Sequence, residues 1–252
     1  MLDLADPLTL GLIVLSYIIG NMVKGVTGFG AILVAVPLMS MLVEPAIAVA
    51  LTAVSVVASN IWQLWDSGNA RFAVKEFWKV LVFLFPASIV GARFLAVVDP
   101  NIMSGVIGAM VVLFCVTQMF PTRPQITEKQ RKYADPIVGL TAGLTGGASI
   151  MSGSVLVAYL IAIDLKKDQF VAAIALLYLV NTIPIYVTLS FFNQFDLATL
   201  IVSACLIVPA ILGLVLGRNL RNKISQKAFE RAVVGLLFVI GCLLIHRAVT
   251  LG

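Results

Sequence analysis

Charged residues are scarce in this sequence of 252 residues. Only 12% of the residues are Asp, Glu, Lys or Arg, whereas 61% are hydrophobic and the mean hydropathy is +1.07. A soluble domain usually carries about 25% charged residues, so the composition argues against that class. Long apolar stretches with the charges gathered between them predict an integral membrane protein. The net charge of +5 is then expected of cytoplasmic loops, and no nucleic-acid partner is predicted.

Residues that commonly catalyse reactions or bind metals are also rare. The sequence has one histidine, His246, and three cysteines, Cys115, Cys205 and Cys242, which lie in apolar segments. The cysteine spacing fits neither a metal site nor a disulfide framework. Catalytic triads, zinc motifs, phosphate-binding loops and dinucleotide fingerprints are missing as well. We therefore predict that the protein is not an enzyme and has no catalytic residue, metal or cofactor.

Ten apolar segments can be drawn along the chain. They cover residues 8–23, 30–43, 45–65, 76–98, 101–120, 136–147, 153–163, 168–192, 196–217 and 228–249. A helix that crosses a bilayer needs about 20 residues. The third, fourth, fifth, eighth, ninth and tenth segments reach that length. The first, second, sixth and seventh are short, and a glycine-rich turn joins the two members of each short pair.

The distribution of basic residues gives this drawing an orientation. If successive segment ends alternate between two sides of a membrane, 15 of the 17 Lys and Arg residues fall on one side, and only Arg93 and Arg247 fall on the other. The positive-inside rule makes the basic side cytoplasmic. Both termini are therefore predicted to lie outside.

The only long polar stretch separates two groups of five segments that resemble each other. The sequence GVTGFG from Gly25 matches GLTGG from Gly143, and LTAVSVVASN, which ends at Asn60, matches IALLYLVN, which ends at Asn181. We predict an all-α polytopic membrane protein with two inverted-topology repeats, residues 1–120 and 136–252, joined by a cytoplasmic linker, residues 121–135. Such repeats are typical of transporters, with the site at the repeat interface. A structural scaffold without transport is the alternative.

The glycine-rich turns are the strongest indication of a binding site. A broken helix is tolerated at membrane depth only against protein or a water-filled cavity. Helices that begin near Gly30 and Gly153 would present free N–H groups and the positive end of the helix dipole, which bind anions. The predicted substrate-binding residues are Lys24, Gly25, Thr27, Gly28, Gly30, Asn60, Gly143, Thr145, Gly146, Gly147, Ser152, Gly153, Ser154 and Asn181.

Each of these assignments has a structural alternative. The glycines can serve close helix packing alone, which is the interpretation we prefer for Gly213 and Gly217. Lys24 can extend its ammonium group to the membrane surface, or it can hold an anion or another partner. Asn60 and Asn181 can hydrogen-bond between helices instead of to a substrate. No buried chain of Asp, Glu or His side chains is indicated, so no proton relay is predicted.

The glycine-rich motif GVTGFGAILVAVPL, repeated as GLTGGASIMSGSVLVAYL, resembles the TauE/SafE-type sulfite exporter (TSUP) family. PAILGLVLGRNL, residues 209–220, resembles the penultimate helix of that family. The resemblance implies a secondary transporter of the bacterial inner (plasma) membrane, with periplasmic termini. Its substrates would be small sulfur-containing or organic anions, sulfite and sulfonates such as sulfoacetate, moved by alternating access. ASIMSG departs from the family pattern, which has further glycines there.

Two alternatives to this transporter remain. An anion channel on the same scaffold is one, and a non-transport membrane scaffold protein is the other. The predicted partners are a small anionic substrate and the lipid bilayer. The small-residue helix faces also permit a homodimer.

Overall fold

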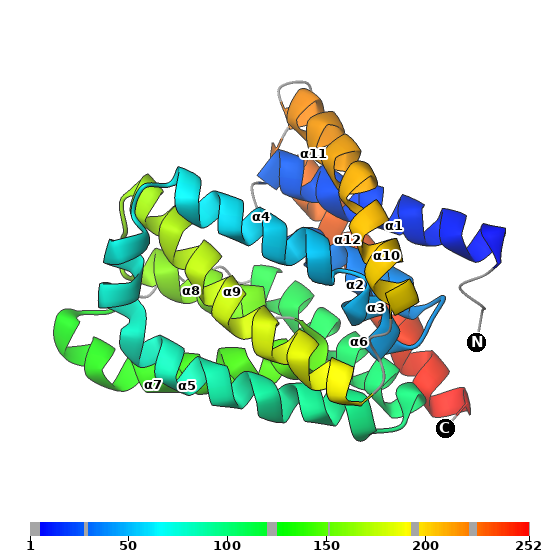
Figure 1. Ribbon diagram of the computed structural model, residues 1–252, viewed down its shortest axis with the longest axis horizontal. Helices are drawn as coiled ribbons and strands as arrows, with labels where there is room; N and C mark the ends of the chain where they lie inside the picture. The colour runs from blue at the N-terminus through cyan, green and yellow to red at the C-terminus, as the bar shows by residue number, and fades with distance from the viewer. Residues whose placement is uncertain are drawn as a thin grey trace. The chain divides into compact units, whose positions relative to one another are not determined.

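The chain is helical throughout the part that the structure describes. The structure is a computed structural model, and it describes residues 6–27, 30–119, 125–150, 152–192, 197–221 and 226–251. These residues form twelve helices and no strand (Figure 1). The helices are α1 (Pro7–Thr27), α2 (Ala31–Ser40), α3 (Pro45–Ala50), α4 (Ala53–Asp66), α5 (Ala70–Val97), α6 (Pro100–Met119), α7 (Glu128–Ser149), α8 (Ser152–Ala162), α9 (Lys167–Phe191), α10 (Leu197–Cys205), α11 (Ile207–Arg221) and α12 (Gln226–Leu251).

Six stretches of the described residues are long and apolar enough to cross a membrane. They are Pro7–Val26, Pro45–Asp66, Ala70–Val97, Asp168–Phe191, Leu197–Gly217 and Val233–Thr250. Shorter apolar helices cover Ala31–Ser40, Pro100–Val116 and Ser152–Ala162. The predicted all-α fold class with several membrane-spanning helices is confirmed. The first predicted segment is long enough to span a membrane, contrary to the prediction, whereas the fifth is not.

The prediction of short helices on both sides of each glycine-rich turn is wrong for the first helix of each pair. Helix α1 has 21 residues and α7 has 22. Their glycines, such as Gly25 and Gly143, lie within the helices on packing faces and do not end them. Helices α2 and α8, with 10 and 11 residues, are short as predicted. The third and ninth predicted segments are each divided, into α3 and α4 and into α10 and α11.

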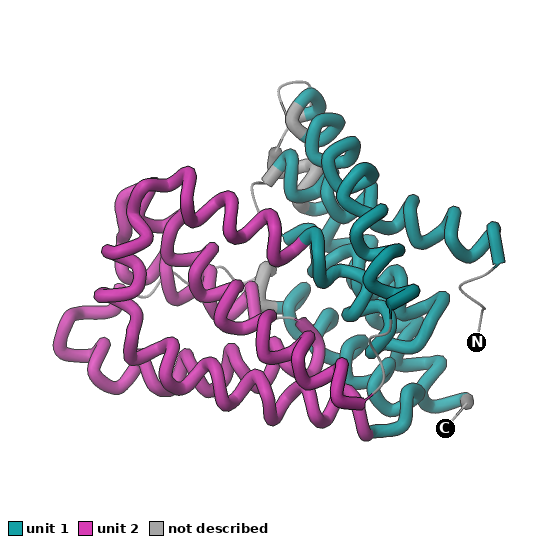
Figure 2. The backbone as a smooth tube through the Cα atoms, viewed as in Figure 1, with its two compact units in different colours: residues 1–55, 98–120, 194–252 teal, residues 56–97, 121–193 magenta. Residues whose placement is uncertain are grey.

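The helices pack into two compact units, which are described separately (Figure 2). Unit 1 contains residues 1–55, 98–120 and 194–252, and unit 2 contains residues 56–97 and 121–193. Each unit takes helices from both sides of the predicted linker. The units are defined by packing, whereas the predicted repeats are defined by sequence resemblance, so the two divisions differ.

In unit 2, α5 and α7 lie parallel with their backbones in close approach. A Cβ atom on Gly139 would lie 2.6 Å from the carbonyl oxygen of Val80, and one on Gly147 would lie 2.5 Å from that of Ser88. The two helices therefore run in the same direction, since later residues of α7 meet later residues of α5. Only small residues allow such an approach, which is common between helices in membranes.

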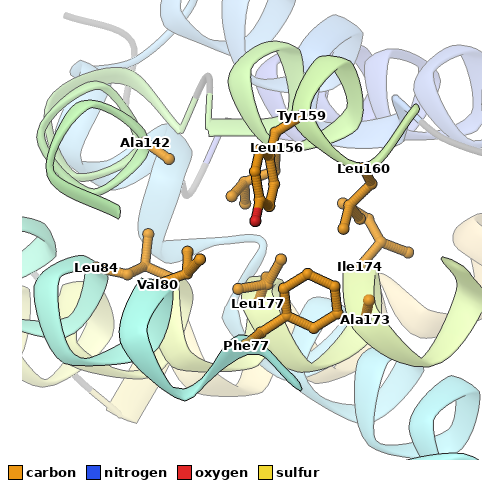
Figure 3. Packing of buried hydrophobic residues seen from close by; sticks show 10 residues of the cluster. All are labelled: Phe77, Val80, Leu84, Ala142, Leu156, Tyr159, Leu160, Ala173, Ile174 and Leu177. Carbon is orange, nitrogen blue, oxygen red and sulfur yellow. The ribbon is translucent and has the colours of Figure 1, made fainter. Parts of the chain in front are cut away.

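The core of unit 2 is built by α5, α7, α8 and α9. The ring of Phe77 in α5 meets that of Tyr159 in α8 edge to face, with 6.3 Å between centroids. Helix α9 runs parallel to α5, because Ala73 packs with Ala172 near the start of both helices and Ser88 contacts Asn181 further along. Figure 3 shows the side chains that converge in this core, which are Phe77, Val80, Leu84, Ala142, Leu156, Tyr159, Leu160, Ala173, Ile174 and Leu177.

Unit 1 contains two further glycine-mediated helix pairs. Helices α1 and α11 are parallel, since a Cβ on Gly213 would collide with the carbonyl oxygen of Ile18 and one on Gly217 with that of Met22. The preferred packing interpretation of Gly213 and Gly217 is therefore confirmed. Helices α6 and α12 are antiparallel. A Cβ on Gly105 would lie 2.8 Å from the Cβ of Ala248, whereas the thiol of Cys115, further along α6, donates to the carbonyl of Val234, near the start of α12.

Candidate functional site

The first predicted turn, between α1 and α2, lies in unit 1. Gly30 precedes α2 in a left-handed conformation, with φ of 88° and ψ of 10°. Residues with a Cβ atom rarely adopt this conformation, so the turn favours glycine at this position. Gly28, also predicted as a site residue, lies outside the described residues, as does the side chain of Thr27.

Lys24 and Gly25 lie at the end of α1. Lys24 is half-buried in the last turn, where a positive charge interacts favourably with the helix dipole. Gly25 packs against α11, since a Cβ on Gly217 would lie 2.9 Å from its Cα atom. The structure thus gives both residues a local structural role, and their contact with a substrate stays a prediction.

The second predicted turn, between α7 and α8, lies in unit 2. It is made at Ile150, whose φ of 57° is left-handed and whose N–H donates to the carbonyl of Gly146 at 2.7 Å. A β-branched residue is strained in this conformation, and strained backbone of this kind is concentrated at functional sites. Ile150 is buried, so the packing of its side chain holds the turn in place.

Three of the predicted residues meet beside this turn. The hydroxyl of Ser152 donates to Oδ1 of the fully buried Asn181 at 2.9 Å. Nδ2 of Asn181 donates to Oγ of Ser88 at 2.8 Å, and this hydroxyl donates to the carbonyl of Leu84 at 2.7 Å. A Cβ on Gly146 would lie 2.5 Å from Oδ1 of Asn181, so glycine there leaves room for the amide. The chain of hydrogen bonds joins α8, α9 and α5.

The other predicted residues of the second half surround this chain in different ways. A Cβ on Gly153 would lie 2.7 Å from the hydroxyl oxygen of Tyr178, so Gly153 allows the phenol to approach the start of α8. The hydroxyl of Thr145 donates to the carbonyl of Thr141 in its own helix at 2.7 Å. Ser154 lies partly buried in the first turn of α8.

Gly143 and Gly147 face away from Asn181. A Cβ on Gly143 would lie 2.6 Å from the carbonyl oxygen of Leu84, and one on Gly147 would lie 2.6 Å from the nitrogen of Ala92. Both glycines therefore bring α7 against the backbone of α5, and Gly146 alone of the three is directed at Asn181.

Asn60, in α4, is the predicted residue with an unused donor. Its side chain is only 3% exposed, and its Nδ2 has no hydrogen-bond partner among the described residues. Leu64, one turn later on the same face of α4, packs against Ala172 and Leu176 of α9. Asn60 therefore lies on the face of α4 that is directed into unit 2.

Sequence reasoning missed Ser88 as a partner of Asn181, and it also missed a buried ionic cluster at the start of α7. Arg131 donates to the carboxylate of Glu76 in α5, and to that of Glu128 at 3.2 Å. The hydroxyl of Tyr159 in α8 donates to Asp135 at 2.5 Å, and Arg131 Nε lies 3.9 Å from the same carboxylate. Burial alone would lower the pKa of Arg131, but its interactions with Glu76 and Tyr159 together outweigh burial and raise the pKa, so the guanidinium stays charged.

The cluster changes the interpretation of residues 128–135. The sequence analysis placed them in a cytoplasmic linker and found no indication of a buried chain of Asp, Glu or His side chains. Helix α7 instead begins at Glu128, where the N–H of Thr127 donates to Oε1 of Gln130 at 2.9 Å as half of a capping box. Arg131 is 9% exposed and Asp135 is 3% exposed. No sequence signal pairs these residues with Glu76 and Tyr159, because both partners are distant in the chain.

A helix break in unit 1 was also not predicted. Between α3 and α4 the helix is interrupted at Leu51 and Thr52, and the N–H of Val54 donates to Oγ of Ser203 in α10 at 3.0 Å. The hydroxyls of Tyr17 and Ser55 are hydrogen-bonded beside the break. Discontinuous helices of this type form binding sites in transporters.

The arrangement in unit 2 is suited to a small polar ligand. Its groups are carboxamides and hydroxyls, which are neutral. The hydroxyl protons of Ser88 and Ser152 are already donated within the chain, and Nδ2 of Asn60 is the described donor that is left for an oxygen atom of an anion. A hydrogen bond to a charged acceptor is stronger than one between neutral groups. Sequence reasoning found Asn60, Asn181, Ser152 and Gly146 from the repeated motifs. Ser88 has no signal beyond its position in PASIVGAR, residues 86–93 of the fourth segment, which resembles PAILGLVLGR, residues 209–218 of the ninth.

Comparison with known protein families gives one result. The model of the family described as "Sulfite exporter TauE/SafE" matches residues 12–244, a range that includes both turns, Asn60 and Asn181. Comparisons with curated proteins and with solved structures gave no match. The match agrees with the motifs read from the sequence. Together with the apolar helices it identifies a multi-pass membrane protein, and the chain belongs to the sulfite exporter TauE/SafE family of transporters.

Proposed function

We propose that the protein is a secondary transporter for small sulfur-containing or organic anions. Sulfite and sulfonates such as sulfoacetate are the proposed substrates, the bacterial inner membrane is the proposed location, and both termini are proposed to be periplasmic. The family supports sulfite as the first substrate to test. Alternating access, in which the site opens to each side of the membrane in turn, is the proposed mechanism.

The observation that carries this proposal is the buried, unpaired amide donor of Asn60. A buried donor without an acceptor costs about 1–3 kcal/mol of stability. Asn60 lies within the candidate span Pro45–Asp66, and its Nδ2 has no partner among the described residues. An oxygen atom of sulfite or a sulfonate would accept this N–H. A neutral amide serves this purpose at lower cost than a charged residue at membrane depth.

In the proposed site of unit 2, Asn60 acts together with the groups beside the second turn. Ser152 and Asn181 supply a hydroxyl and an amide, and Gly146 and Gly153 let the side chains of Asn181 and Tyr178 lie against the turn. The N–H groups at the start of α8 add donors and the positive end of a helix dipole. Lys24, Gly25, Thr27, Gly28 and Gly30, at the first turn in unit 1, remain proposed substrate-binding residues in their own right.

The packing within each unit supports the proposed inverted repeats. The sequence correspondence pairs the first segment with the sixth and the fourth with the ninth. Unit 2 contains the parallel pair α5 and α7, which are the fourth and sixth segments, and unit 1 contains the parallel pair α11 and α1, which are the ninth and first. Duplicated halves would produce this correspondence, and in both pairs glycines make the close contact.

The test is sulfite flux in proteoliposomes, with Asn60→Leu as the variant and Ser59→Ala as its control. The Ser59 hydroxyl already donates to the carbonyl of Val56, so its loss removes a neighbouring polar group without an unused donor. A hydrogen bond to an anion is worth about 1.5–3 kcal/mol, so sulfite binding by Asn60→Leu should weaken roughly 10- to 100-fold. Ser59→Ala should transport as wild type does.

The stability of Asn60→Leu separates a substrate ligand from a structural residue. Leucine removes the unpaired donor and keeps a similar volume, so its thermal midpoint in detergent should equal or exceed that of wild type. Lower flux with undiminished stability supports the proposal. Unchanged flux, or a stability loss that accounts for the flux loss, would remove Asn60 from the site.

Two other functions are distinguished in the same liposomes. A carrier shows accelerated exchange when unlabelled sulfite is present on the opposite side, whereas an anion channel shows none. A non-transport scaffold protein gives no sulfite flux above that of empty liposomes. Either result would overturn the proposed carrier mechanism, and the second would overturn the transport function itself.

A further inference from the structure

All three tryptophans of the chain lie at one end of unit 2 with their side chains exposed. Trp62 and Trp65, at the end of α4, are 62% and 72% exposed and meet edge to face with 5.4 Å between centroids. Trp78, near the start of α5, is 54% exposed. Exposed tryptophans of a membrane protein concentrate at the level of the lipid headgroups, because the ring is apolar and its N–H is polar.

The outward face of α5 has the polarity gradient of a membrane surface. Arg71, Lys75, Trp78 and Val82 are exposed and follow one another at helical spacing on that face. The order is basic, then aromatic, then apolar. Lys75 and Val82 are about 10 Å apart along the helix axis, by a rise of 1.5 Å per residue. This distance is comparable to the thickness of the headgroup region, which separates water from hydrocarbon.

The basic end of this face contains a hollow. It has a volume of about 350 Å³ and is lined by Ala70, Arg71, Val74 and Lys75. The nearby carboxylate of Glu76 is held by Arg131, so it does not neutralise the two basic residues of the hollow. The surface of the hollow is almost wholly apolar, so Arg71 and Lys75 line it mainly with their aliphatic chains, and both side chains are exposed.

We propose that this face of α5 binds an anionic phospholipid, with Arg71 and Lys75 as ligands of the headgroup phosphate. The exposed tryptophans and the apolar continuation of the face favour a lipid over a soluble phosphate, because acyl chains would cover Trp78 and Val82. Basic side chains at a membrane surface attract anionic lipids and are screened by salt. The proposal is independent of the proposed transport function.

The positions of the tryptophans allow a direct test. The protein is reconstituted in vesicles of phosphatidylcholine and phosphatidylglycerol, and in each sample one of the two lipids carries bromine near the headgroup end of its acyl chains. Bromine quenches tryptophan fluorescence on contact, and Trp78 lies about one turn from Lys75 on the same face of α5. We expect brominated phosphatidylglycerol to quench more at equal mole fraction, with a relative affinity of roughly 5- to 30-fold, the contribution of one to two basic side chains. Raised salt should reduce this preference.

The double variant R71Q/K75Q should lose the preference for phosphatidylglycerol. K129Q/K132Q is its matched control, because it removes two charges from exposed positions at the start of α7, outside the hollow. Retained preference in this control supports the site. Equal quenching by the two lipids in wild type, or equal losses in both double variants, would overturn it. Displacement by soluble glycerol phosphate would overturn the lipid assignment in favour of a soluble phosphate ester.

Discussion

Replacing Gly147 by alanine tests whether α5 and α7 are held at backbone contact. The added Cβ would lie 2.5 Å from the carbonyl oxygen of Ser88, 2.6 Å from the nitrogen of Ala92 and 2.7 Å from the Cα of Gly91. All three are backbone atoms of α5, so no side chain can rotate away. An ordinary contact begins near 3.4 Å, and the helices must therefore separate by almost 1 Å locally.

Two opposing effects set how much Gly147→Ala changes the stability of the protein. Overpacking of a filled interface costs about 1–3 kcal/mol, and occasionally more. Alanine within a helix is favoured over glycine by about 1 kcal/mol. Gly11, within α1, is the matched control, since nothing lies within 4 Å of a Cβ placed there. Gly147→Ala should therefore destabilise by up to about 2 kcal/mol, whereas Gly11→Ala should stabilise by up to about 1 kcal/mol.

Thermal unfolding of the purified variants in one detergent measures the difference. For chains of this size, 1 kcal/mol shifts the midpoint by about 2–4 °C, so the midpoints of the two variants should differ by roughly 4–10 °C. Gly147→Ala is expected below wild type and Gly11→Ala at or above it. Equal midpoints for the two variants would refute the close packing of α5 against α7 and the argument built on it.

Three further substitutions test single contacts by thermal unfolding. Tyr159→Phe removes the hydroxyl that donates to the buried carboxylate of Asp135, and it should lower stability by about 1–3 kcal/mol. Tyr133→Phe is its control and should have no effect, because that side chain is 70% exposed. Gly30→Ala should cost about 1–2 kcal/mol through its left-handed backbone, and Gly30→Asn less. Ser203→Ala should lower the midpoint, since the N–H of Val54 loses its acceptor. A midpoint equal to that of wild type would contradict the contact concerned.

The membrane-spanning class was predictable because it depends on composition alone. Burial in hydrocarbon requires long apolar stretches, and these remain visible in any sequence that has them. Part of the candidate site was predictable for a related reason. Polar residues such as Asn60 and Asn181 stand out in apolar segments, and the repeated motifs point to the same two places. Gly146, Ser152 and Asn181 do meet beside the second turn.

The limits of the helices were harder to predict, because glycine has two roles that look alike in a sequence. It can end a helix, or it can allow a neighbouring helix to approach. At Gly30 the left-handed backbone shows the first role, and at Gly143 and Gly147 the contacts with α5 show the second. The sequence analysis gave preference to the first role, and so it ended the first segment at residue 23, whereas α1 continues to Thr27. The greater length of α7 comes mainly from its start at Glu128, within the predicted linker.

Long-range contacts account for the features that the sequence analysis missed. The break at Leu51 and Thr52 contains no glycine or proline, and it is stabilised by Ser203, which is remote in the chain. The burial of Arg131 likewise depends on Glu76 in another helix. A polar stretch is ordinarily solvated, so only the fold reveals that its charges are paired.

Helix directions within the units constrain how the chain is threaded through the membrane. For helices that traverse the bilayer, an even difference in segment number requires a parallel pair and an odd difference requires an antiparallel pair. The parallel pairs are α5 with α7 (fourth and sixth segments), α5 with α9 (fourth and eighth) and α1 with α11 (first and ninth), and α6 with α12 (fifth and tenth) is antiparallel. All four directions are those that the ten-segment alternation requires.

If the sixth and seventh segments together made a single crossing, α5 and α9 would be antiparallel. With α6 as a crossing helix, the parallel directions of α5 and α9 agree with the prediction that this short pair returns the chain to the side from which it entered.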